Sequence, residues 1–83
     1  MDMYLKIVSP EKVVFEGLVE SVAVPGTVCP FVILKNHAPI ISSLTEGNVD
    51  YVAEDGKHSI QITGGFVEVQ KNEVRLAVEV NQK

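Results

Sequence analysis

The chain has 83 residues, a formal net charge of −4 and one cysteine. This length fits one domain, residues 1–83, with one thin core, and a single cysteine excludes an internal disulfide. The acidic balance and the lack of a basic run argue against nucleic acid or anionic lipid as the main partner. No stretch approaches the roughly 20 apolar residues that span a bilayer, and the start, MDMYLKIVSP, lacks signal-peptide features. We therefore expect a protein that is soluble when isolated.

Alternating apolar and polar residues predict short β-strands from the start of the chain. Fifteen valines against four alanines favour pleated, half-buried surfaces. Segment 3–8 predicts a first strand, and segment 9–12 a turn. In segment 13–24 the alternation changes phase near Gly17, which predicts a bulge or sharp bend there. After Gly17, the predicted inward positions are Leu18, Val22 and Val24.

The second half of the chain continues the strand pattern. Short apolar runs at 31–34 and 39–44 flank a turn at 35–37, and Asp55-Gly56 signals a tight hairpin. Gly64-Gly65 predicts a corner or a close approach of backbones, and Lys71-Asn72 a turn before the last strand. Turn signals recur about every ten residues. The sequence therefore predicts an all-β fold, a flattened antiparallel β-sandwich or barrel of about 8–10 short strands.

Segment 22–44 concentrates turn-forming residues within this strand-rich chain. It contains three of the four prolines, the only cysteine and one of the two histidines. Pro25-Gly26 opens it as a turn, and residues 36–39 close it. Because loops held by a rigid scaffold usually carry function, we expect a binding surface here.

Catalytic chemistry has little support in the sequence. Cys29 and His37 suggest a nucleophile and base, with Asp50 or Asp55 as orienter, but no nucleophile-elbow pattern surrounds the cysteine. The plainer interpretation is a small, partly buried thiol in an apolar loop. His37 either braces its turn by bonding to backbone or contacts a partner from an exposed loop. We predict a binding or structural module, not an enzyme.

Metal and phosphate sites are not predicted either. Neither His37 nor His58 has a second ligand at metal-binding spacing, and His58 is interpreted as an ordinary strand residue beside a hairpin. No helix that could receive a phosphate is predicted after Gly64-Gly65. No cofactor is expected.

Six segments, in order along the chain, carry a family resemblance: 7–11 (IVSPE), 15–22 (FEGLVESV), 24–27 (VPGT), 37–39 (HAP), 41–44 (ISSL) and 64–69 (GGFVEV), with Gly47 between the last two. Together they resemble the N-terminal domain of the epsilon subunit of F-type ATP synthases, called delta in mitochondria. The resemblance covers essentially the whole chain. It implies a flattened β-sandwich in the central rotor stalk, at the cytoplasmic face of the bacterial plasma membrane.

The resemblance also implies a function. In that family the domain docks on the gamma subunit and on the polar loops of the membrane c-ring, near the alpha and beta subunits of the head. It couples proton-driven rotation to ATP synthesis without catalysing anything itself. The alternative that we retain is a stand-alone β-sandwich module that binds a peptide or small ligand at the 25–39 loop.

The chain departs from the family pattern in two ways. The family continues into a C-terminal helical hairpin, whereas only three residues follow Val80 here; if this is the full natural chain, inhibition by inserted helices is not expected. The loop also has Cys29 and Val32 at expected glycine positions, Lys35-Asn36 for Pro-Gly, and Pro30 for the usual acidic residue. We expect a more apolar rotor-ring contact.

The expected site residues fall into two groups. The predicted contacts with gamma or the c-ring are Gly26, Cys29, Pro30, Phe31 and His37. The predicted structural turns are Gly17, Asn36, Gly64 and Gly65.

Overall fold

The computed structural model describes residues 3–80, which form strands and turns without a helix. The eight strands are β1 (Met3–Val8), β2 (Val13–Val24), β3 (Phe31–Ile33), β4 (Ile40–Leu44), β5 (Gly47–Ala53), β6 (Gly56–Ile62), β7 (Gly64–Gln70) and β8 (Glu73–Glu79). The all-β prediction and the predicted number of strands are therefore confirmed.

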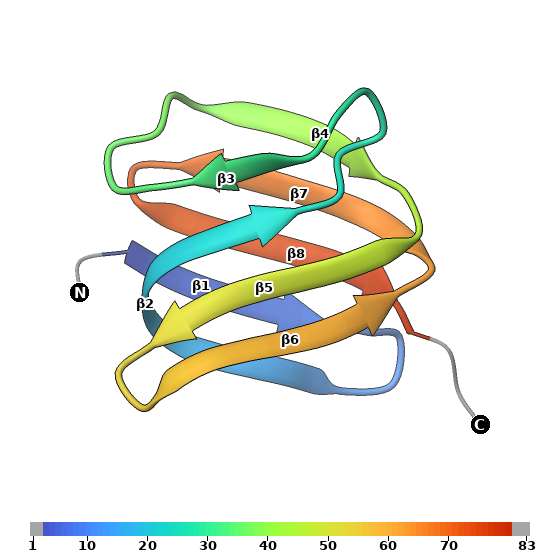
Figure 1. Ribbon diagram of the computed structural model, residues 1–83, viewed down its shortest axis with the longest axis horizontal. Coiled ribbons are helices and arrows are strands. Elements are labelled where there is room, and N and C mark those ends of the chain that lie inside the picture. The colour runs from blue at the N-terminus through green and yellow to red at the C-terminus, as the bar shows by residue number, and fades with distance from the viewer. Residues whose placement is uncertain (1–2, 81–83) are drawn as a thin grey trace.

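The strands form two layers, with β2 shared between them (Figure 1). Along the hydrogen-bonded path the order is β4-β7-β8-β1-β2-β5-β6, and β3 pairs with the end of β2. The first half of β2 pairs with β1, whereas its second half pairs with β5 and β3. The extents of 33 × 28 × 18 Å are those of a flattened sandwich.

One pairing departs from the expected antiparallel arrangement. β1 and β8 run parallel, with Leu5 opposite Val74 and Ile7 opposite Leu76, whereas the other paired strands are antiparallel. Parallel neighbours need a long connection between them, and the chain from β2 to β7 supplies it. The sheet is therefore mixed, and the last strand lies between β7 and the first strand.

The bulge expected at Gly17 lies elsewhere. Gly17 pairs in regular register with Leu5, and the irregularities fall near Val14, opposite the step from Ile7 to Val8, and at Glu20, between Val19 and Ser21. The phase of alternation therefore changes at Glu20, because a bulge inserts one residue and turns the following side chains to the other face.

This shift reverses two predicted orientations in β2. Leu18, predicted to face inward, is exposed, and Val19 is buried in its place. Gly17 has a different role, because a Cβ there would lie 3.3 Å from the ring of Phe15. The missing side chain leaves room for that ring, which lies 4.5 Å from the ring of Tyr51.

The core lies between the layers and contains only apolar side chains and Tyr51. No side chain of a charged residue is buried among the described residues. The buried residues are Met3, Leu5, Ile7, Val19, Val22, Val24, Ile33, Leu44, Val49, Tyr51, Ala53, Ile62, Val67, Val69, Val74, Leu76 and Val78. Because these residues alternate with more exposed ones along the strands, apart from the irregularity in β2, the period-two pattern specifies which face is buried.

Gly65 fits the close approach of backbones that the sequence suggested. Its φ is 147°, and a Cβ would lie 2.3 Å from the carbonyl oxygen of Ala77. Gly64 is less restricted, since the nearest atom to its Cβ position is 3.7 Å away. The chain passes from β6 in one layer to β7 in the other at this point, so the glycine pair also forms a corner.

Candidate functional site

The loop that follows β2 is anchored to β4 by backbone bonds. The amide of Thr27 donates to Ser43 O at 3.0 Å, and the amide of Thr45 donates to Pro25 O at 2.9 Å. Gly26 forms a bridge with Leu44. These bonds fix the base of the loop against the edge of the sandwich.

Gly26 shapes the loop and offers no surface to a partner. It is buried, and a Cβ there would lie 2.6 Å from Cys29 O and 2.8 Å from the Phe31 ring. The contact role expected for Gly26 is therefore corrected to a structural one, because the loop closes over the backbone at this position.

The tip of the loop is exposed and mostly apolar. Val28 is 98% exposed, and Cys29 and Pro30 are also exposed. Neither Cys29 nor Val32 adopts a positive φ, so replacing the expected glycines causes no backbone strain. The tip therefore has the apolar character that the sequence suggested.

The structure brings together two of the expected contact residues, Phe31 and His37. Their rings lie 6.3 Å apart, and both side chains are half-buried. The His37 ring bonds through Nδ1 to Ala38 O at 2.7 Å, and its amide donates to Leu34 O at 3.1 Å. His37 thus braces the turn while its side chain stays partly exposed.

Asn36 ties the loop to a distant turn. Both Asn36 and Asn72 have positive φ, 67° and 61°, which asparagine tolerates better than most residues. The amide of Asn36 donates to Asn72 Oδ1 at 2.7 Å, and Asn72 Nδ2 donates to Asn36 Oδ1 at 3.3 Å. The amide of Tyr4 also donates to Asn72 O. Asn72 therefore links the loop, the β7–β8 turn and the start of β1.

The proposed catalytic arrangement is not assembled. Within residues 3–80 no hydrogen bond joins Cys29 to His37, and Asp55 bonds instead to His58 Nε2 at 2.7 Å. No group of three or more histidine, cysteine, aspartate or glutamate side chains in the same range could hold a metal ion. Nor does that range include a helix long and apolar enough to cross a membrane.

Asp55 and His58 form part of an aromatic cluster at the β5–β6 hairpin. The hydrogen bond from His58 lowers the pKa of Asp55, and burial raises the pKa of Tyr51. The His58 ring stacks on Tyr51 with centroids 5.1 Å apart. Tyr51 belongs to the core and Phe15 packs against it, so His58 has a packing role in addition to its place in the strand.

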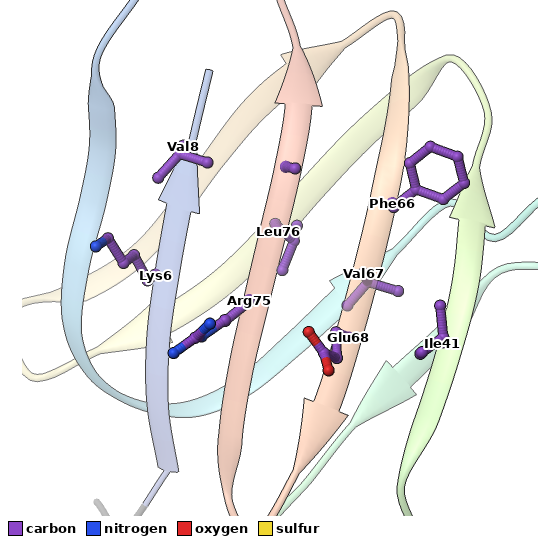
Figure 2. A pocket seen from close by; sticks show the side chains of 9 residues that line it. Lys6, Val8, Ile41, Phe66, Val67, Glu68, Arg75 and Leu76 are labelled. Carbon is purple, nitrogen blue, oxygen red and sulfur yellow. The ribbon is translucent and has the colours of Figure 1, made fainter. Parts of the chain in front are cut away.

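A second surface lies on the outer face of β4, β7, β8 and β1. Side chains there line a shallow groove of about 490 Å³, called here the outer groove: Lys6, Val8, Ile41, Phe66, Glu68, Arg75 and Ala77, with Val67 and Leu76 beneath (Figure 2). Ile41 is 75% exposed and Phe66 61% exposed. Large apolar residues exposed side by side are a common mark of an interaction site.

Strand register aligns the outer groove in two cross-strand rows. One is largely apolar and runs from Phe66 through Ala77 to Val8. The neighbouring row runs from Ile41 through Glu68, Arg75 and Lys6 to Glu16. The outer groove therefore combines an apolar strip with a charged strip in which two neighbouring cations, Arg75 and Lys6, lie between two carboxylates.

Sequence reasoning missed the outer groove, although part of its signal lies in the sequence. Phe66 and Val8 lie in the solvent-facing phase of strands whose other phase is buried. Ile41 similarly belongs to an apolar run with one face exposed. Apolar residues at outward positions indicate a contact surface only when neighbouring strands align them, and that alignment was not visible in the sequence.

Comparison with known proteins assigns the family. The family model described as "ATP synthase, Delta/Epsilon chain, beta-sandwich domain" matches residues 2–82. Among relatives named ATP synthase epsilon chain, that of Chlorobium limicola is 43% identical over 76 residues, covering 90% of this chain and 86% of the relative. That of Nitratidesulfovibrio vulgaris strain Miyazaki F is 39% identical over 77 residues, covering 93% and 58%.

Solved structures share the fold. A chain in the mitochondrial ATP synthase of Euglena gracilis (OSCP/F1/c-ring) has a TM-score of 0.86 at 19% identity, with 93% of this chain and 50% of that chain covered. A chain in the central stalk and c-ring of the Tetrahymena thermophila enzyme has a TM-score of 0.77 at 18% identity, with 95% and 64% covered. Several of the similar curated relatives are longer, and this chain spans about 58% of the length of those from Nitratidesulfovibrio vulgaris. The chain belongs to the family of ATP synthase delta/epsilon β-sandwich domains.

Proposed function

We propose that this chain is a non-catalytic rotor subunit of a bacterial F-type ATP synthase. It docks on the gamma subunit and on the polar loops of the c-ring, below the alpha and beta subunits, and couples proton-driven rotation to ATP synthesis. Family membership supports this function, as does the likeness to chains from assemblies named for the central stalk and c-ring. Its place is then the cytoplasmic face of the plasma membrane, attached through the complex.

The observation that carries the proposal is the exposure of large apolar side chains in the outer groove. Phe66 and Ile41 expose 61% and 75% of their surfaces, and an isolated domain gains nothing from that exposure. A flat sheet face on a rigid core suits docking against another folded subunit, where an ordinary interface covers about 800 Å² on each partner. We assign this face to gamma.

The 25–39 loop supplies the second contact, with the c-ring. Its apolar tip, Val28 to Pro30, projects beyond the anchored base, and Phe31 with His37 forms its inner side. Rotation needs a connection that does not bend. The bonds from the loop to β4, and from Asn36 to Asn72, supply that stiffness.

Binding to gamma tests the function directly. The 83-residue chain is titrated against the alpha–beta–gamma assembly of the same organism, with Phe66→Ser and Val32→Ser as matched variants. Both side chains are apolar and exposed, Phe66 to 61% and Val32 to 52%. Val32, however, lies on β3 in the other layer. We expect Phe66→Ser to weaken binding at least tenfold, since truncated apolar anchors commonly cost more than about 1.4 kcal/mol, and Val32→Ser to bind normally.

Absence of binding by the folded wild-type chain would contradict the rotor function. A folded chain that does not bind gamma, but binds a peptide or small ligand at the 25–39 loop, would instead support the stand-alone module. The c-ring contact is tested separately by co-purification with the detergent-solubilised complex. There Val28→Asp should lower retention of the c-ring without altering retention of gamma.

A further inference from the structure

Two cations lie side by side in the outer groove. Lys6 on β1 and Arg75 on β8 are cross-strand partners in the parallel pair, and both line the groove. Figure 2 shows the guanidinium of Arg75 reaching toward β1 on the side of the sheet that carries Lys6. The chain as a whole is acidic, with 11 acidic residues against 7 basic ones, so this pairing of positive charges runs against the overall balance.

Neither cation is neutralised by a close carboxylate within residues 3–80. Glu68 lies opposite Arg75, and Glu16 lies opposite Lys6. Within the described residues, neither of these two pairs forms an ion pair. Glu16 instead accepts a hydrogen bond from the Tyr4 hydroxyl, which raises the pKa of Tyr4. Like charges directly opposite one another destabilise a sheet, so the arrangement costs the isolated chain stability.

Docking on this face would increase the energetic effect of the two charges, because it removes them from water. Phe66, Ile41 and Val8 flank them, and a partner that covers these apolar side chains also removes water from Lys6 and Arg75. Burying an ionised group is unfavourable unless an opposite charge or strong hydrogen bonds replace the water. A partner that covers Lys6 and Arg75 therefore binds better when it brings negative charge to them.

We infer that the gamma segment that docks on the outer groove presents one or more carboxylates to Lys6 and Arg75. Its apolar side chains contact Phe66 and Ile41. The inference rests on the proposed docking to gamma and adds the chemistry of the contact. Arg75 offers a planar fork of donors that matches a carboxylate in two hydrogen bonds, and Lys6 adds a second positive charge beside it.

The test is a titration of the alpha–beta–gamma assembly with three forms of the chain. These are the wild type, a groove variant with both Lys6→Gln and Arg75→Gln, and a control variant with both Lys12→Gln and Lys57→Gln. The control removes the same two charges from exposed positions outside the outer groove, on β6 and in the β1–β2 turn. We expect the groove variant to raise Kd by about tenfold or more, because interfacial charge pairs carry that much or more. The control should stay within about threefold of the wild type.

Salt dependence gives an independent readout. Wild-type affinity should fall as salt rises from about 50 to 500 mM, because exposed charges are screened at those concentrations. The groove variant should lose most of that dependence, whereas the control keeps it. Urea unfolding midpoints of the variants establish that each one is folded in the titration.

The possible failures are distinguishable. If wild-type chain binds and the groove variant matches the control in affinity and salt dependence, the acidic contact is wrong and the docking function stands. Tighter binding by the groove variant means that gamma presents positive charge there, which also overturns the inference. If the folded wild-type chain does not bind gamma, the docking function and this inference fail together.

Discussion

Gly64 and Gly65 offer a matched pair of substitutions for testing how closely β7 approaches β8. Gly65 has φ 147°, and a Cβ there would lie 2.3 Å from Ala77 O and 2.8 Å from Val78 Cα. The adjacent Gly64 has no positive φ, and the nearest atom to its Cβ position is Leu44 O at 3.7 Å. Gly65→Ala should therefore destabilise the fold strongly, and Gly64→Ala should not.

The expected magnitude has two parts. An L-residue held in a backbone conformation that favours glycine costs about 1–3 kcal/mol. Relieving a contact of 2.3 Å with a backbone carbonyl requires β7 and β8 to separate by about 1 Å, which weakens ladder hydrogen bonds worth about 0.5–1.5 kcal/mol each. Together we expect Gly65→Ala to lose about 3–5 kcal/mol, out of about 4–12 kcal/mol for a domain of this size.

Urea unfolding and thermal unfolding, both followed by circular dichroism, compare the two variants with the wild type. Gly65→Ala should lower Tm by at least about 12 °C, at roughly 4–8 °C per kcal/mol for a small domain. Gly64→Ala should change the free energy of unfolding by less than about 1 kcal/mol, in either direction. Equal losses in the two variants, or a neutral Gly65→Ala, would show that the close approach of the two strands is wrong.

Substitutions at three further positions test other parts of the structure. The hydrogen bond to His58 lowers the pKa of Asp55 from 3.8. The ionised Asp55 therefore stabilises the fold above that value, and this contribution is lost as the pH falls through the lower folded pKa. Asp55→Asn should be less stable than the wild type near pH 6, and the difference between their urea midpoints should shrink as the pH falls below about 3.8. Asn72→Ala and Asn72→Gly both remove the side-chain bonds to Asn36, but only alanine is strained at φ 61°. In urea unfolding, Asn72→Ala should therefore lower the free energy of unfolding by about 1 kcal/mol more than Asn72→Gly. Equal decreases in the two variants would contradict this account. Leu5→Ala should cost about 2–5 kcal/mol in the same assay, because Leu5 is fully buried and a cavity remains; a loss below about 1 kcal/mol would mean that this part of the core is loosely packed.

The sequence was a good guide wherever a signal was local. Val67 and Val69 alternate with exposed neighbours as predicted, and so do Val74 and Leu76. Lys71-Asn72 forms the expected turn, with φ of 52° and 61°. A strand and its turn depend on residues that are neighbours in the chain, since side chains in a strand alternate between faces with a period of two.

Pairing was harder to predict. Alternation does not distinguish registers that differ by two residues, because both keep the same face buried. The parallel pair of β1 with β8 and the irregularity at Glu20 therefore could not be derived from the pattern. Leu18 shows the consequence, because placing the phase change at Gly17 instead of Glu20 put its side chain on the wrong face.

One of the two candidate sites could be predicted from the sequence, and the other could not. The apolar, proline-rich loop was visible in the composition of segment 22–44, since turn formers and exposed apolar residues stand close together in the chain. The outer groove was not visible, because it joins Ile41, Phe66 and Val8 from three strands with the charges of Lys6 and Arg75. The sequence by itself determined the strands, the buried faces of most of them and the family to which the chain belongs. Only the tertiary structure decided which outward residues lie side by side, because the register of strands far apart in the chain is specified by the packing of the whole core.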